Sequence, residues 1–156
     1  MSDIDWSNPK QMISKYFSVR EALWLPKWSR LAAPGDGFND GVASAILTFA
    51  RLDMDRVREF IGVPIRVHCW YRPARYNQEI GGAPHSSHRC EFGYSACDWD
   101  AIIDSNLDIG SNCDLLRSKL MGILEDFGLR MEDNGPKSPW IHLDNAPVKT
   151  KRFFNP

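Results

Sequence analysis

Both the fold and the chemistry of this chain depend on residues 67–100, which read VHCWYRPARYNQEIGGAPHSSHRCEFGYSACDWD. Apolar and polar residues alternate over residues 65–69, which predicts a strand, and residues 94–101 predict a second one. A loop rich in Gly, Pro, Ser and His joins the two. Because side chains two residues apart on a strand share a face, Asp98 and Asp100 are expected to point to the same side.

A later apolar stretch, residues 140–144, predicts a further strand that carries His142. If this strand pairs with the strand of Asp98, the two side chains come within metal-ligand reach, and His88 can join them from the preceding loop. Two imidazoles and one carboxylate can hold zinc with one coordination position open, which is typical of hydrolytic rather than structural sites. The sequence therefore predicts a metal site, although a single histidine is more often an ordinary hydrogen-bonding residue.

Helical patterns account for much of the remaining chain. Signals for the start of a helix occur at the capping box Ser18-Val19-Arg20-Glu21, at Asn39 or Asp40, and at Ser111 or Asn112. Gly62 and Gly128 are expected to end the second and third of these helices. Short strands are expected at residues 129–132 and 140–144. Helices that come first, followed by short strands on either side of one more helix, are typical of an α+β fold.

We therefore expect an α+β fold in which flanking helices cover a small antiparallel sheet that carries the zinc site. The length of 156 residues suits a single domain, residues 1–156. Residues 1–38 are expected to form an irregular, partly helical N-terminal part, and residues 39–156 the core.

Composition excludes several classes of protein. The net charge is −1 and there is no long basic run, which argues against nucleic acid as a partner. The first residues lack the basic start and apolar segment of a signal peptide, and no stretch is apolar enough to span a membrane. We expect a monomer made in the cytoplasm. Four cysteines without a C-x-x-C pair do not require a disulfide framework in a chain of this length.

Several short motifs follow one another along the chain. They are Cys69-Trp70-Tyr71-Arg72, Tyr76-Asn77, Gly81-Gly82-Ala83-Pro84, Ser86-Ser87-His88, Ala96-Cys97-Asp98 and Trp140-Ile141-His142. In this combination they resemble the zinc D-alanyl-D-alanine carboxypeptidase family, which has a hedgehog-like fold and includes phage endolysins that cut cell-wall peptides. Tyr16-Phe17-Ser18 and Gly62-Val63-Pro64 match its N-terminal part, so the resemblance covers most of the chain.

The resemblance implies that His88, Asp98 and His142 are zinc ligands and that the substrate is a peptidoglycan stem peptide. Arg72 matches the arginine that holds a substrate carboxylate or carbonyl, which suits its forked, permanently charged guanidinium. A structural arginine that ties down the following loop is the alternative. Ser86 matches a serine that bonds either the substrate or a neighbouring site residue.

Two of the chain's departures from the family pattern bear on the metal site and the general base. The interval between His88 and Asp98 is longer than in the family because residues 89–93 contain an insertion, which leaves Asp100 as a rival ligand. Pro139 stands where many members carry the acidic general base. The candidates that remain for the catalytic acid are Glu132, Asp133 and Asp144, and Asp144 is equally suited to orienting an imidazole.

The resemblance therefore implies a zinc metallopeptidase, either a D-Ala-D-Ala carboxypeptidase or an endopeptidase of the L-Ala-D-Glu type. Such a protein would act at the cell wall after release from the cytoplasm, or as part of a virion. One alternative is a non-catalytic phage structural or cell-wall-binding module that keeps the zinc fold. Two others are a zinc hydrolase with a different substrate and a closed structural zinc site at His85, His88, Cys90 and Cys97.

Overall fold

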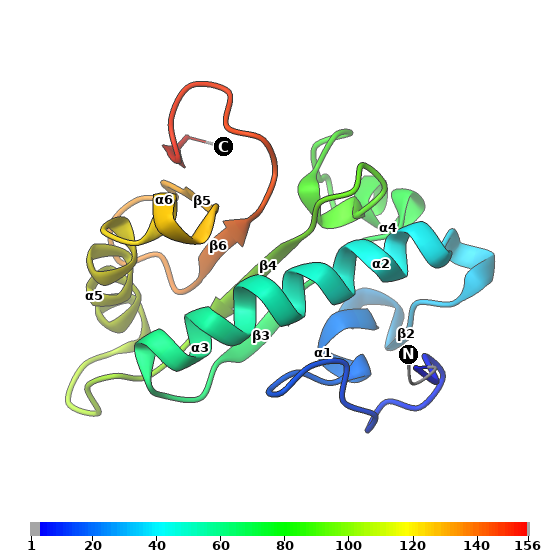
Figure 1. Ribbon diagram of the computed structural model, residues 1–156, viewed down its shortest axis with the longest axis horizontal. Helices are drawn as coiled ribbons and strands as arrows, with labels where there is room; N and C mark the ends of the chain where they lie inside the picture. Colours follow the sequence, from blue (N-terminus) through cyan, green and yellow to red (C-terminus); the bar gives the residue numbers. More distant parts are fainter. Residues whose placement is uncertain (1–3, 156) are drawn as a thin grey trace.

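The computed structural model describes residues 4–155 and has an α+β architecture (Figure 1). Its strands are β1 (Trp24–Leu25), β2 (Arg30–Leu31), β3 (Arg66–Cys69), β4 (Ala96–Asp100), β5 (Arg130–Glu132), β6 (Ile141–Asp144) and β7 (Phe153–Phe154). Its helices are α1 (Val19–Leu23), α2 (Asp40–Thr48), α3 (Asp55–Ile61), α4 (Ala74–Glu79), α5 (Ile109–Met121) and α6 (Leu124–Phe127), with a π-helical turn η3 (Phe49–Met54) and short 3-10 turns such as η4 (Ser87–Arg89). The predicted fold class is confirmed.

The main sheet has the strand order β3-β4-β6-β5-β7. Its first four strands are antiparallel to their neighbours, as predicted, whereas β7 runs parallel to β5. The sequence did not predict β7. In addition, β1 and β2 pair as a separate antiparallel ribbon.

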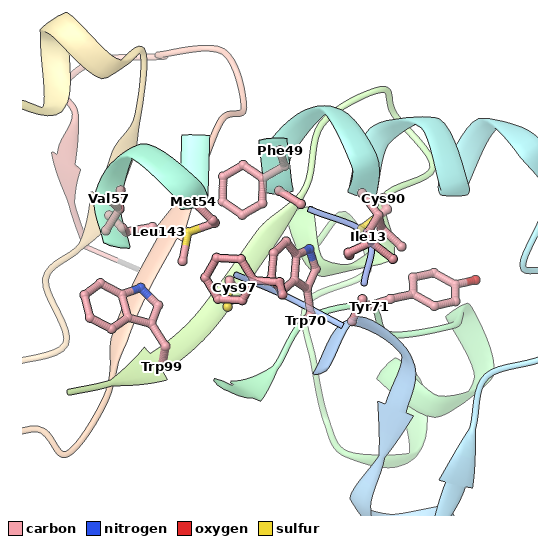
Figure 2. Packing of buried hydrophobic residues seen from close by; sticks show 14 of the residues in the cluster. Ile13, Phe49, Met54, Val57, Trp70, Tyr71, Cys90, Cys97, Trp99 and Leu143 are labelled. Atoms are coloured by element: carbon pink, nitrogen blue, oxygen red, sulfur yellow. The ribbon is translucent and has the colours of Figure 1, made fainter. Parts of the chain in front are cut away.

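One face of the main sheet is apolar and packs against a long helix. α2, η3 and α3 follow one another without a break and cross the sheet (Figure 1). Figure 2 shows Phe49, Met54 and Val57 of this helix among the buried side chains, close to Trp70 and Trp99 of the sheet region. The side chain of Asn39 caps the helix start, and Gly62 ends it with a φ of 74°, a left-handed conformation that favours glycine.

α5 begins at a different cap from the one predicted. The side chain of Asp108, rather than that of Ser111 or Asn112, accepts a hydrogen bond from the backbone amide of Ser111. Asn112 lies inside the helix and is fully buried, and its amide group bonds the backbone of Ile103 and Asp104. The predicted cap was wrong because the side chain of Asn112 holds the preceding loop in place and does not cap the start of α5.

Residues 4–38 belong to the same core as the rest of the chain. The capping box of Ser18 and Glu21 starts α1 as predicted. Ile13, Phe17 and Leu23 are almost fully buried and join the main hydrophobic cluster. All four cysteines are free thiols. Within residues 4–155, no helix has the length and apolar character needed to cross a membrane.

Candidate metal centre

The three predicted metal ligands meet on the polar face of the sheet. Asp98 of β4 lies directly opposite His142 of β6, and His88 enters from η4, just before β4. Asp98 Oδ1 lies 2.8 Å from His142 Nδ1 and 3.1 Å from His88 Nε2, and the two ring nitrogens are 3.2 Å apart. Both histidines are buried, and 13% of the Asp98 side chain is exposed. This cluster could hold a metal ion.

The spacing of the three donor atoms fits one face of a tetrahedral site. With zinc–ligand bonds of about 2.0–2.1 Å, neighbouring ligand atoms lie roughly 3.3 Å apart. The distances between His88, Asp98 and His142 are only a few tenths of an ångström shorter, so a small outward shift of the side chains suffices.

The second nitrogen of each imidazole is held by an acceptor. His88 Nδ1 donates to the backbone oxygen of Trp70 at 2.7 Å, and His142 Nε2 donates to Asp144 Oδ2 at 3.0 Å. When each imidazole is neutral and keeps its proton on that nitrogen, the lone pairs of His88 Nε2 and His142 Nδ1 point into the cluster; a metal ion there would replace the second proton that His142 otherwise shares with Asp98. Partners of this kind fix the tautomer and the ring orientation of metal-binding histidines.

Asp144 is a fully buried anion that positions His142. Arg130 of β5 donates to both of its carboxylate oxygens, at 2.7 and 2.9 Å, and Ser87 Oγ donates to Oδ2 at 3.1 Å. Burial alone would raise the pKa of Asp144, but the bonds to His142 and Arg130 lower it to about 2. Asp144 therefore lies behind the imidazole, on the side away from Asp98, which favours the orienting role over that of a catalytic acid.

The electrostatics of the ligands follow from these contacts. Burial lowers the pKa of His88. Burial would also lower the pKa of His142, but its hydrogen bonds to Asp144 and Asp98 raise it to about 10. For Asp98, burial acts to raise the pKa, yet His88 and His142 hold it well below its usual range. Asp98 is therefore an anion, ready to act as a ligand.

Arg72 is tied to the cluster itself. Its Nη2 donates to Asp98 Oδ2 at 2.6 Å, its Nε donates to Cys69 Sγ at 3.0 Å, and its backbone amide donates to the oxygen of His88 at 2.8 Å. Asp98 thus offers one oxygen to the histidines and the other to Arg72. Arg72 Nη1 makes no hydrogen bond to any residue between 4 and 155, so this amino group of the guanidinium can still donate to a bound molecule.

The two adjacent candidates for the general base, Glu132 and Asp133, differ in whether they face the metal cluster. The register of β5 with β6 pairs Met131 with Leu143, which places Glu132 beside His142 on the polar face. Glu132 is half-buried, and burial raises its pKa, with the charges of His142 and Asp98 as further influences. Asp133, the next residue, instead accepts a bond from the amide of Gly135 in the following turn. Of the two, only Glu132 faces the cluster.

The remaining predicted site residues have supporting positions. Ser86 is the N-cap of η4, and its Oγ accepts a hydrogen bond from the backbone amide of His88. Asp100, the rival ligand, lies outside the cluster and pairs with Arg66 and His68. The structure thus favours Asp98 over Asp100.

Three residues of the site were not predicted: Ser87, Arg130 and Phe154. The ring of Phe154 lies 6.3 Å from that of His142, between centroids, and 4.5 Å from the guanidinium carbon of Arg130. Arg130 could have been found in the sequence, because it lies two residues before Glu132 and so shares its face. The position of Phe154 depends on β7, for which the sequence holds no clear signal.

Comparison of the chain with models of protein families, with curated proteins and with solved structures finds no match.

Proposed function

We propose that this protein is a zinc-dependent peptidase that hydrolyses peptide bonds in the stem peptides of bacterial peptidoglycan. The observation that carries the proposal is the convergence of His88, Asp98 and His142, with donor atoms within 4.8 Å of one another. The motif resemblance supplies the choice of zinc and of the substrate. One chain provides all three donors, so a monomer suffices for function.

Each side chain around the cluster would have a different role in hydrolysis. When bound, zinc supplies a Lewis acid and lowers the pKa of water toward neutrality. Glu132 would accept the proton of the attacking water and pass it to the leaving amine, for which a raised pKa is suited. Arg72 would hold a substrate carbonyl or carboxylate through its free Nη1, while Trp70 and Asp144 keep the imidazoles in place.

A second candidate function is a zinc-binding module without turnover. Pro139 favours it, because this residue cannot move a proton and stands where the resemblance places an acid. In that case the protein would bind zinc and cell-wall peptides without cutting them. Either protein would work at the cell wall after release from the cytoplasm, or as part of a virion.

The experiment combines zinc content with hydrolysis. Purified protein is loaded with zinc, its metal is measured by elemental analysis, and release of peptides from purified peptidoglycan is followed with and without a chelator. His88→Ala and His142→Ala are expected to lose both zinc and activity. His85→Ala is the matched control, because His85 is exposed and lies outside the cluster.

Zinc bound without any hydrolysis would support the non-catalytic module. Full zinc content in both His88→Ala and His142→Ala would contradict the metal centre itself.

A further inference from the structure

His88 stands on a less rigid support than the other two proposed metal ligands. Asp98 and His142 lie on β4 and β6, which are paired along a ladder of backbone hydrogen bonds. His88 lies on η4, a turn of three residues that ends at Cys90, whose φ of 56° is left-handed. Sites built on strands are held more precisely than sites built on loops. Contacts from outside η4 are therefore needed to hold the imidazole of His88 in place.

A closed cycle of buried hydrogen bonds begins and ends at His88. The imidazole Nδ1 donates to the backbone oxygen of Trp70 at 2.7 Å, and the indole Nε1 of Trp70 donates to Ser95 Oγ at 2.9 Å. Ser95 Oγ lies 3.2 Å from Cys90 Sγ, which in turn lies 3.5 Å from the backbone oxygen of His88. Trp70, Cys90 and Ser95 are at most 1% exposed, and Figure 2 shows Trp70 and Cys90 among the buried side chains.

The direction of each bond in this cycle follows from what its groups can do. An indole N–H can only donate and a carbonyl oxygen can only accept, so Ser95 Oγ accepts from Trp70 and the Cys90 thiol donates to His88. The hydroxyl hydrogen of Ser95 then points to Cys90 Sγ, and every polar hydrogen of the cycle has an acceptor. Buried hydrogen bonds that follow one another in this way strengthen each other. The cycle therefore holds His88 at both its imidazole and its backbone.

Ser95 joins the cycle to the strands that carry the other two ligands. Its backbone amide donates to Asn145 Oδ1 at 2.8 Å, and the backbone amide of Asn145 donates back to the Ser95 oxygen at 3.3 Å. Ser95 directly precedes β4 and Asn145 directly follows β6, so these bonds extend the contact between the two strands. A movement of His88 away from Asp98 and His142 would break bonds of the cycle.

We propose that Ser95 and Cys90 are positioning residues of the metal centre. Through the cycle they hold His88 Nε2 where a metal ion can bind it together with the other two ligands. This inference rests on the proposed zinc centre but not on peptide hydrolysis. Cys90 belongs to residues 89–93, the segment by which the chain departs from the family pattern, so the resemblance assigns it no role. Its thiol is a link between Ser95 and the backbone of His88.

The test measures zinc affinity and the geometry of the metal site in variants of these two residues. Ser95→Ala and Cys90→Ala break the cycle, whereas Cys90→Ser keeps a hydrogen-bonding group on the same backbone. The zinc Kd is measured by competition with a chromogenic chelator, and the visible spectrum of the cobalt(II)-loaded protein reports coordination geometry. We expect both Ala variants to raise the zinc Kd about tenfold and to alter the cobalt spectrum, and Cys90→Ser to restore most of the affinity.

Cys113→Ala is the matched control, because Cys113 is a fully buried free thiol on α5 that lies outside the cycle. It is expected to lose stability without a change in zinc affinity. Chemical unfolding of the metal-free variants shows that they fold and how much stability each has lost; if Ser95→Ala does not fold, the two Cys90 variants carry the test. An unchanged Kd in folded Cys90→Ala would overturn the proposal, and so would a Cys90→Ser variant that binds zinc no better than Cys90→Ala.

Measurements on the metal-free protein separate this proposal from that of the zinc centre. If the wild type binds no zinc, the zinc proposal fails, and exchange of the His88 Nδ1 proton with water, followed by NMR, tests the cycle by itself. Faster exchange in Cys90→Ala than in Cys113→Ala would support the cycle, and equal exchange would overturn it. If the wild type and all variants bind zinc equally well, the zinc centre stands and the positioning role fails.

Discussion

Asp98 and Asp100 show how neighbouring side chains of one type acquire different roles. They share a strand and a face, yet Asp98 meets two imidazoles and Asp100 meets Arg66 and His68. The sequence narrowed the ligand to this pair through the two-residue period of a strand. The match of Ala96-Cys97-Asp98 to the family motif favoured Asp98, and its position opposite His142 on β6 agrees with that preference.

The two aspartates can be separated by zinc binding. Asp98→Asn removes an anionic ligand and is expected to lower zinc affinity at least roughly tenfold, whereas Asp100→Asn is expected to keep zinc. Elemental analysis after dialysis against a weak chelator measures the difference. Zinc lost only from Asp100→Asn would show that the ligand had been assigned to the wrong residue of β4.

Glu132 and Asp133 make a second pair of adjacent acids with different surroundings. Glu132→Gln is expected to keep zinc and to lower kcat by about 10²–10⁴-fold, because the side chain can no longer accept a proton. Asp133→Asn is the control and should retain kcat, since Asp133 bonds the turn at Gly135. Measurement of kcat for both variants at equal zinc content decides the matter. A normal kcat in Glu132→Gln would show that Glu132 is not the general base.

At the scale of elements, the long helix contains a feature that its apolar spacing did not reveal. The helical pattern predicted a continuous helix, and the structure has one, but the turn η3 is π-helical. Asp53 lies in this turn and is buried, where it accepts a hydrogen bond from Asn145 at 3.0 Å. The other end of the Asn145 amide accepts from the backbone of Ser95, just before β4. This contact ties the helix to the strands that carry the metal centre.

Burial of Asp53 makes stability depend on pH. Burial raises the pKa of Asp53 from 3.8 to about 6. At low pH the Asp53 carboxyl group is neutral in both the folded and the unfolded protein. As the pH rises through about 6, the free energy of unfolding falls, because the unfolded protein releases this proton more readily than the folded protein does. Asp53→Asn is expected to add up to about 3 kcal/mol to the free energy of unfolding near pH 8 and almost nothing near pH 4. Urea unfolding at the two pH values measures this, and an equal effect at both would contradict a buried, raised-pKa carboxyl.

At the scale of the whole molecule, the metal centre joins parts of the chain that are far apart in sequence. His88 lies before β4, and His142 lies on β6 after the whole of α5 and α6. Residues 4–38 support it indirectly, since the backbone amide of Tyr71 donates to Ala22 of α1 and so anchors the segment of Arg72. The long helix, α5 and the strands β3 to β6 could be predicted in their order from local patterns, whereas β1, β2 and α4 were not predicted. Strand register and the docking of β7 could not be predicted, because they depend on contacts between distant segments.

An ion that binds only the folded chain must stabilise it. At a free zinc concentration one hundred times Kd, the gain is about 2.7 kcal/mol. We therefore expect the thermal midpoint to rise with added zinc and to fall with chelator in the wild type, and to stay constant in His88→Ala. Calorimetric scans with and without zinc measure this. A midpoint that ignores zinc in the wild type would argue against a site formed by folding.

The extra residue in β3 has a consequence for how this chain tolerates change in length. Trp70 is fully buried beneath the helix, and Arg72 stands beside Asp98. The bulge sets which of the residues after it turn inward and which turn toward the ligands. Loss of one residue there would exchange the faces of Cys69, which pairs with Asp98, and of the neighbouring Trp70, and so would turn an indole away from the apolar layer. The number of residues between Val67 and Cys69 is therefore more strictly constrained than their identity, and deletion of one residue there would destabilise the fold more than most substitutions.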